Sequence, residues 1–114
     1  MSVEEFRQSI ILYREMIEEG HDPLDLLNTV DSRLADISNH IAVCHRVLAE
    51  QRCLLNLSIF PAARRKHSSK IDSAGAALDQ VIAFQDELFH LRLKVLRLVA
   101  DRFGYQSGRS PMSG

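Results

Sequence analysis

The residues of this chain that could do chemistry are five histidines and two cysteines among 114 residues. His40 and Cys44 lie four apart on a predicted helix, so both side chains could face one metal ion. A zinc site needs further protein ligands, and no other residue falls at a spacing that completes this one. Glu18 and His21 have the spacing of a di-iron helix motif, but Gly20 ends the helix between them. We therefore predict no metal ion and no cofactor.

Catalytic patterns are equally weak. Arg33 and His40 have a spacing similar to that in helical ribonuclease domains of the HEPN type, but the flanking residues do not match that motif, and we assign the chain to no family. We find neither a glycine-rich phosphate loop nor a Ser/His/Asp arrangement. Cys44 is interpreted as a small apolar residue of a helix seam rather than a nucleophile. We therefore predict that the protein is not an enzyme.

A cluster of basic residues lies in the middle of the chain. Its members are Arg52, Arg64, Arg65, Lys66 and Lys70. Phosphate contacts by such a cluster would give salt-sensitive, sequence-independent binding of nucleic acid. Phe60 is the one aromatic residue nearby, and no aromatic is interleaved for base stacking. The alternative is a solvated loop whose bases also complement the carboxyl end of a helix.

The net charge of −1 hides an uneven distribution. Residues 1–40 hold nine acids and three bases, whereas residues 41–70 hold one acid and six bases. Residues 71–114 hold five of each. The first third of the chain is therefore acidic and the middle is basic.

Helix start and stop signals predict three helices, over residues 2–19, 23–60 and 69–103. Gly20 ends the first helix, and Asp22 followed by Pro23 starts the second. The stretch from Pro61 to the two serines at 68 and 69 is interpreted as the second break. We expect residues 105–114 to form a disordered tail and residues 1–104 to form one domain.

The second helix carries a long apolar seam. Its positions, read every three then four residues, are Leu27, Val30, Leu34, Ile37, Ile41, Cys44, Leu48, Gln51, Leu55 and Ser58. Such a seam predicts a helix that lies against another helix. With a short connection to the third helix, it predicts an all-α fold: a short N-terminal helix followed by a long antiparallel, coiled-coil-like hairpin that assembles into a helical bundle.

Half of this hairpin has nothing in the chain to cover it, because the first helix is half as long as the second. The third helix also has a second apolar stripe. We therefore predict a protein interface formed by Leu54, Leu57, Ile59, Val81, Ile82, Phe89, Leu93 and Leu96. The expected partner is a second copy, in a homodimer or larger assembly, or a larger protein complex. The alternative is that the second helix bends and the monomer closes.

Three polar residues, Gln51, Gln85 and Arg92, occupy otherwise apolar columns. Buried polar residues often fix helix register or oligomer number. Antiparallel alignment makes Asp36 the first choice of partner for Arg92. The alternative is that Arg92 extends outward between the two stripes.

Cysteine spacing and hydropathy indicate the compartment. Cys44 and Cys53 lie about 13 Å apart along one helix, too far for a disulfide. No apolar run approaches a membrane span, and the first residues are charged, so we expect a cytoplasmic protein without membrane contact. Two functions are favoured: a non-catalytic adaptor, scaffold or inhibitor-type subunit, or an accessory subunit that binds nucleic-acid backbone through its basic tip. A helical-bundle nuclease or metal enzyme is the third option, and the sequence supports it least.

Overall fold

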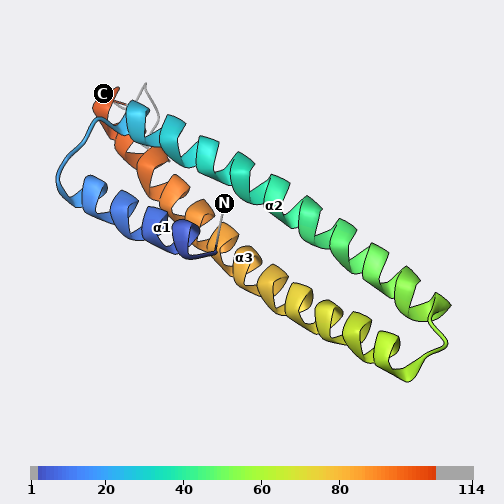
Figure 1. The fold of residues 1–114 in the computed structure, drawn as a ribbon. Helices are drawn as coiled ribbons and strands as arrows, with labels where there is room; N and C mark the ends of the chain where they lie inside the picture. Colours follow the sequence, from blue (N-terminus) through green and yellow to red (C-terminus); the bar gives the residue numbers. More distant parts are fainter. Residues whose placement is uncertain (1–2, 105–114) are drawn as a thin grey trace.

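The computed structural model describes residues 3–104, which form an all-α fold of three helices (Figure 1). They are α1 (Val3–Glu18), α2 (Pro23–Leu57) and α3 (Pro61–Arg102). As predicted, a short helix precedes a long antiparallel hairpin, and the molecule is a rod of 74 × 29 × 15 Å. We call residues 23–42 and 80–102 the proximal half of the hairpin, and residues 43–57 and 61–79 the distal half.

The connection from α1 to α2 follows the sequence signals. Gly20 adopts a φ of 79°, a left-handed conformation that glycine reaches without strain. The backbone N–H of His21 donates to the carbonyl of Met16 over 3.1 Å and closes the end of α1. Asp22 Oδ1 accepts from the N–H of Leu24, and Pro23 takes the first helical position.

The connection from α2 to α3 is shorter than the sequence suggested. α2 ends at Leu57 rather than Phe60, and α3 begins at Pro61 rather than Ser69. Pro61 starts the helix, because a proline at the first helical position gives up no hydrogen bond. The basic residues expected in a loop therefore lie on the first turns of α3, and only residues 58–60 join the two helices.

Most of the core lies in the proximal half, where all three helices meet. Its buried residues are Phe6, Ile10, Tyr13, Val30, Ile37, Val81, Leu88 and Leu91. A smaller cluster, Cys44, Leu48 and Leu78, lies in the distal half. The predicted seam of α2 is found: Val30, Ile37, Cys44 and Leu48 are buried, and its other six positions are half-buried.

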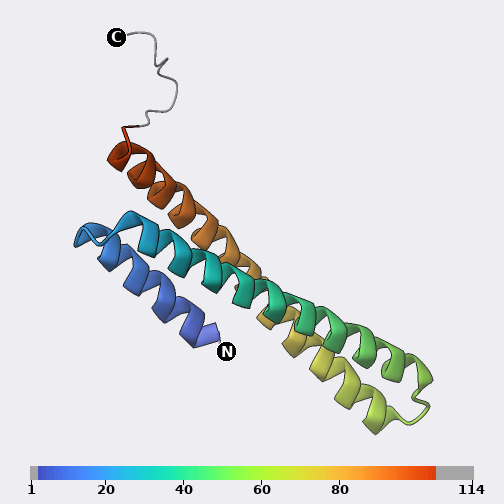
Figure 2. The same cartoon turned by 90° about the horizontal axis from the view of Figure 1, so that it is seen from above.

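α1 packs antiparallel to α2 along one side of the hairpin (Figures 1 and 2). Tyr13 contacts α2 at Arg33, whose Nε donates to the tyrosine hydroxyl over 3.2 Å. Phe6, two turns earlier, contacts His40. Arg14 forms an ion pair of 3.2 Å with Glu87 of α3. α1 thus covers both long helices as far as His40 and leaves the distal half uncovered.

Both views show α2 as one continuous helix along the whole rod, so the alternative of a bent second helix is not found (Figures 1 and 2). In residues 3–104, no helix has the length and apolar character needed to cross a membrane. The predicted tail, residues 105–114, lies outside the described residues.

Candidate interaction surface

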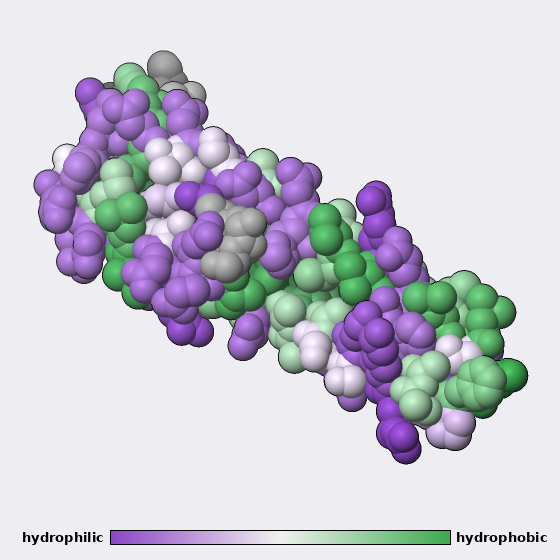
Figure 3. Space-filling model, in the orientation of Figure 1, coloured by the Kyte–Doolittle hydropathy of each residue, from purple (hydrophilic) through white to green (hydrophobic). Residues whose placement is uncertain are grey.

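The three most exposed large apolar side chains of residues 3–104 lie at the end of the rod that α1 does not reach. They are Ile59 at 81 %, Leu57 at 74 % and Phe60 at 69 %, and Leu54 on the neighbouring turn of α2 is 43 % exposed. Figure 3 shows hydrophobic surface over this distal half, interrupted by hydrophilic side chains. Apolar groups gathered in this way are typical of a contact surface.

A second heptad seam runs along α2, which the sequence analysis did not identify. Its positions alternate by four and three residues: Asp36, His40, Val43, Val47, Glu50, Leu54 and Leu57. We call this the outer seam. Its first two positions are polar and lie beside the start of α1, whereas four of the five positions beyond His40 are apolar. Val43 is 55 % exposed and Val47 is half-buried. The seam thus becomes apolar at the level where α1 stops covering it, and its four-three spacing was the available signal.

One predicted interface residue is not at the surface. Val81 is fully buried in the proximal core and contributes nothing to an exposed interface. It lies one heptad from Leu88, so both belong to the column of α3 that faces the other helices. The remaining α3 positions are accessible: Ile82, Phe89 and Leu93 are exposed, and Leu96 is half-buried. They form a second apolar surface, which we call the α3 stripe.

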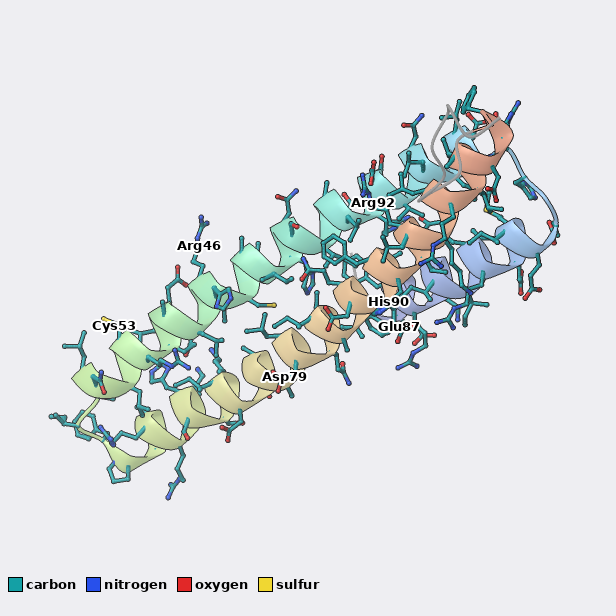
Figure 4. All side chains as sticks on the ribbon, turned by 180° about the vertical axis from the view of Figure 1, so that it is seen from behind. Arg46, Cys53, Asp79, Glu87, His90 and Arg92 are labelled. Atoms are coloured by element: carbon teal, nitrogen blue, oxygen red, sulfur yellow. The ribbon has the colours of Figure 1, made fainter. Side chains whose placement is uncertain are left out.

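Arg92 binds an acid, but not the one expected. Its Nε donates to Oδ1 of Asp31 over 2.7 Å, between side chains that are 37 % and 46 % exposed. Asp36 instead forms an ion pair of 3.1 Å with Arg33. The difference is about one and a half turns of α2, because the short loop shifts the register between α2 and α3. Figure 4 labels Arg92 on α3.

Gln51 is half-buried and joins the two long helices. His67 Nδ1 donates to Gln51 Oε1 over 2.7 Å. This bond places His67 of α3 level with Gln51 of α2 in the distal half. Gln85 is also half-buried, and its side chain makes no hydrogen bond with other residues of the described range.

Arg33 and His40, the pair with nuclease-like spacing, both serve to hold α1. Partial burial disfavours the charged form of Arg33, but hydrogen bonds to Tyr13 and Asp36 outweigh it and raise the pKa of the guanidinium. His40 packs against Phe6. Across residues 3–104, no group of three or more His, Cys, Asp or Glu side chains is placed to hold a metal ion.

The basic cluster surrounds the tip of the rod. Arg52, Arg64, Arg65, Lys66 and Lys70 are all exposed. Arg64 already has a structural role, because its Nη1 donates to the carbonyls of Leu55 and Ser58, over 3.0 Å each. It therefore completes the carboxyl end of α2, which agrees with the alternative stated above. Residues 51–71 contain five arginines and lysines and no acid, so the tip is both basic and apolar.

The hollows of this surface are open. The largest of those described, about 550 Å³, lies on the distal half. Gly75 and Ala76 leave space for it, between Arg52 of α2 and Asp79 of α3. Its charged lining residues are Arg52, Asp72 and Asp79, and its apolar ones include Leu48, Ile71 and Leu78. It is a shallow depression between two helices rather than an enclosed pocket. Comparison of the chain with protein-family models, with curated proteins and with solved structures finds no match in any of the three.

Proposed function

We propose that this chain is a non-catalytic adaptor, scaffold or inhibitor-type subunit that acts through helix–helix contacts with other proteins and through self-association. One observation carries the proposal: the distal half exposes Leu54, Leu57, Ile59 and Phe60 at the end of a hairpin that α1 does not cover. We further propose that it works in the cytoplasm, where its unpaired thiols, Cys44 and Cys53, stay reduced.

The energetics of the distal half support this proposal. Its buried cluster has three residues, against eight in the proximal core. Two helices alone bury little apolar surface, and helices in proteins gain most of their stability from tertiary packing. A partner that covers the distal half would therefore stabilise it. The binding energy would come from burying the exposed apolar side chains of Leu54 and Leu57 on α2 and of Ile59 and Phe60 in the loop.

The solution mass of the protein tests this proposal. We expect light scattering to give a dimer or larger species for the unmodified chain and a monomer for Leu54→Asp combined with Leu57→Asp. Leu12→Asp is the matched control, because Leu12 is 51 % exposed on α1, away from the distal half. A monomer for the unmodified chain, or no effect of the distal substitutions, would contradict self-association through this surface.

A second candidate is an accessory subunit that binds nucleic-acid backbone, which the acid-free basic tip favours. Arg65, Lys66 and Lys70 would contact phosphates, because Arg64 is bonded to the carboxyl end of α2. Binding to a mixed-sequence single-stranded oligonucleotide should weaken steeply with salt and disappear when these three residues are replaced by glutamine. Binding that survives the substitutions would refute this role.

A further inference from the structure

We infer that the partner of the distal half is a second copy of this chain, which lies antiparallel to the first so that the outer seams of the two α2 helices pack together. This inference rests on the proposed function and specifies the partner and its orientation. Each hairpin would supply the helices that the distal half of the other lacks, which makes a four-helix core between two three-helix ends.

The outer seam matches itself when it is reversed. Its exposed part runs from Val43 to Leu57, about 21 Å of helix, and its central position is Glu50. Antiparallel pairing about Glu50 places Val43 opposite Leu57 of the second copy and Val47 opposite Leu54. Each large leucine then packs against a smaller valine. The two-fold axis repeats each of these contacts, so each forms twice, as in an isologous interface.

α1 determines which orientation is available. It lies on the same side of α2 as the outer seam, because Phe6 contacts His40 and Tyr13 contacts Arg33. If the two tips pointed the same way, both α1 helices would lie between the hairpins and hold the seams at least one helix diameter, about 10 Å, too far apart. In the antiparallel arrangement only distal halves overlap, and neither α1 is in the way.

The central charges are balanced between α2 and α3. Glu50 would face its own copy, which alone is repulsive. Lys70 lies three heptads before Leu91 and therefore on the same side of α3. Leu91 lines a surface hollow together with Arg14 of α1, so this is the side of α3 that faces α1 in the proximal half. Since His67 is level with Gln51, Lys70 comes close to the level of Glu50. Two Glu50 and two Lys70 side chains therefore gather around the two-fold axis with no net charge.

The ends of the contact are complementary in charge and shape. The tip of the second copy reaches the start of α1, where Glu4 and Glu5 lie in the first helical turn. Arg65 and Lys66 lie more than one turn behind this tip, so they would attract these carboxylates at longer range, and Glu4 already pairs with Arg7 over 3.1 Å. Next to them is an open hollow of about 350 Å³, lined by Asp36, Asn39, His40 and Val43. This hollow is at the level that Ile59 and Phe60 of the second copy would reach.

Site-specific crosslinking tests the orientation. In the full chain with Cys53→Ser, so that the remaining Cys44 is buried, one cysteine is introduced as Glu50→Cys or as Ile59→Cys. Both positions are exposed, so the folded chain accepts the change. With a short bis-maleimide, we expect covalent dimers from Glu50→Cys and none from Ile59→Cys or from Cys53→Ser alone. Crosslinking from Ile59→Cys would mean that the tips meet, which overturns the inference.

A charge exchange gives a second, independent readout. Glu50→Lys should weaken dimerisation about tenfold, because four positive charges then surround the axis, and adding Lys70→Glu should restore it. A dimer that forms without the Glu50→Cys crosslink, or without this rescue, overturns the antiparallel arrangement and leaves the proposed function standing. A monomeric unmodified chain overturns both. A species that forms only with added oligonucleotide also overturns the inference and favours the nucleic-acid role.

Discussion

The rings of Phe6 and His40 meet edge to face, with centroids 5.5 Å apart and planes at 89°. This contact joins the start of α1 to the middle of α2. It marks the level at which a three-helix bundle becomes a two-helix hairpin, and the outer seam of α2 changes from polar to apolar at the same level. The fold and the candidate interface are thus two consequences of where α1 lies.

Removing the Phe6 ring should destabilise the monomer strongly. Phe6 is fully buried, and Phe6→Ala should lower the free energy of unfolding by about 3–5 kcal/mol through lost burial and the cavity that remains. Urea denaturation measures this change. Leu12→Ala on the exposed side of the same helix should cost at most about 0.5 kcal/mol. Equal losses for the two variants would show that α1 does not pack as described.

Removing the Tyr13 hydroxyl should loosen α1 by a smaller amount. Tyr13→Phe deletes the acceptor for Arg33 Nε and should cost about 1 kcal/mol. The raised pKa of Arg33 means that its stabilising contribution is complete at pH values below its ordinary pKa and is lost only as pH rises through the raised value. The cost of Tyr13→Phe in urea should therefore be the same at pH 6 and pH 8. A cost that differs between the two would contradict this assignment.

Two neighbouring arginines at the tip should behave differently. Arg64→Ala removes two hydrogen bonds to the carbonyls of Leu55 and Ser58. It should lower the free energy of unfolding by about 1 kcal/mol and lower the melting temperature accordingly. Arg65→Ala changes an exposed side chain and should have almost no effect on stability. Differential scanning calorimetry compares the two variants. If Arg65→Ala is the more destabilising, Arg64 does not have the capping role described here.

The ion pair of Arg92 and Asp31 should matter more for specificity than for stability. Both side chains are more than a third exposed, so a double-mutant cycle should give a coupling of at most about 1 kcal/mol. Arg92→Leu would extend the α3 stripe and should broaden the distribution of oligomers in sedimentation velocity. An unchanged, homogeneous oligomer would mean that Arg92 does not restrict assembly.

The sequence predicted the three helices because their signals are local. Gly20, Asp22 and Pro23 define the first connection, and the seam of α2 follows from spacing alone. The predicted start of α3 was wrong because Pro61 was interpreted as a break. A proline is also favourable at the first position of a helix, and Pro61 occupies that position here. That error placed the basic residues in a loop.

The candidate interface was harder to predict because it depends on relations between helices. The partner of Arg92 requires the register of α2 against α3, which the true length of the loop sets. Val81 was assigned to the surface because it was placed in the half of the hairpin that α1 leaves uncovered, whereas it is fully buried in the core that includes Phe6 of α1. Val43 and Val47 were missed because their exposure depends on how far α1 extends along α2, which the sequence of α2 does not contain.

The unequal covering of the rod has a consequence for its dynamics. In the distal half, residues 43–57 and 61–79, a cluster of three buried side chains packs the two helices together. The free energy of local unfolding, which controls exchange of the backbone amides, should therefore be lower there than in the proximal half. Amide hydrogen exchange there should slow as protein concentration rises, because association with a partner protects the helix pair. On dilution, the distal half would be the first segment exposed to proteases. Local unfolding of this segment would therefore determine how long an unassembled chain survives.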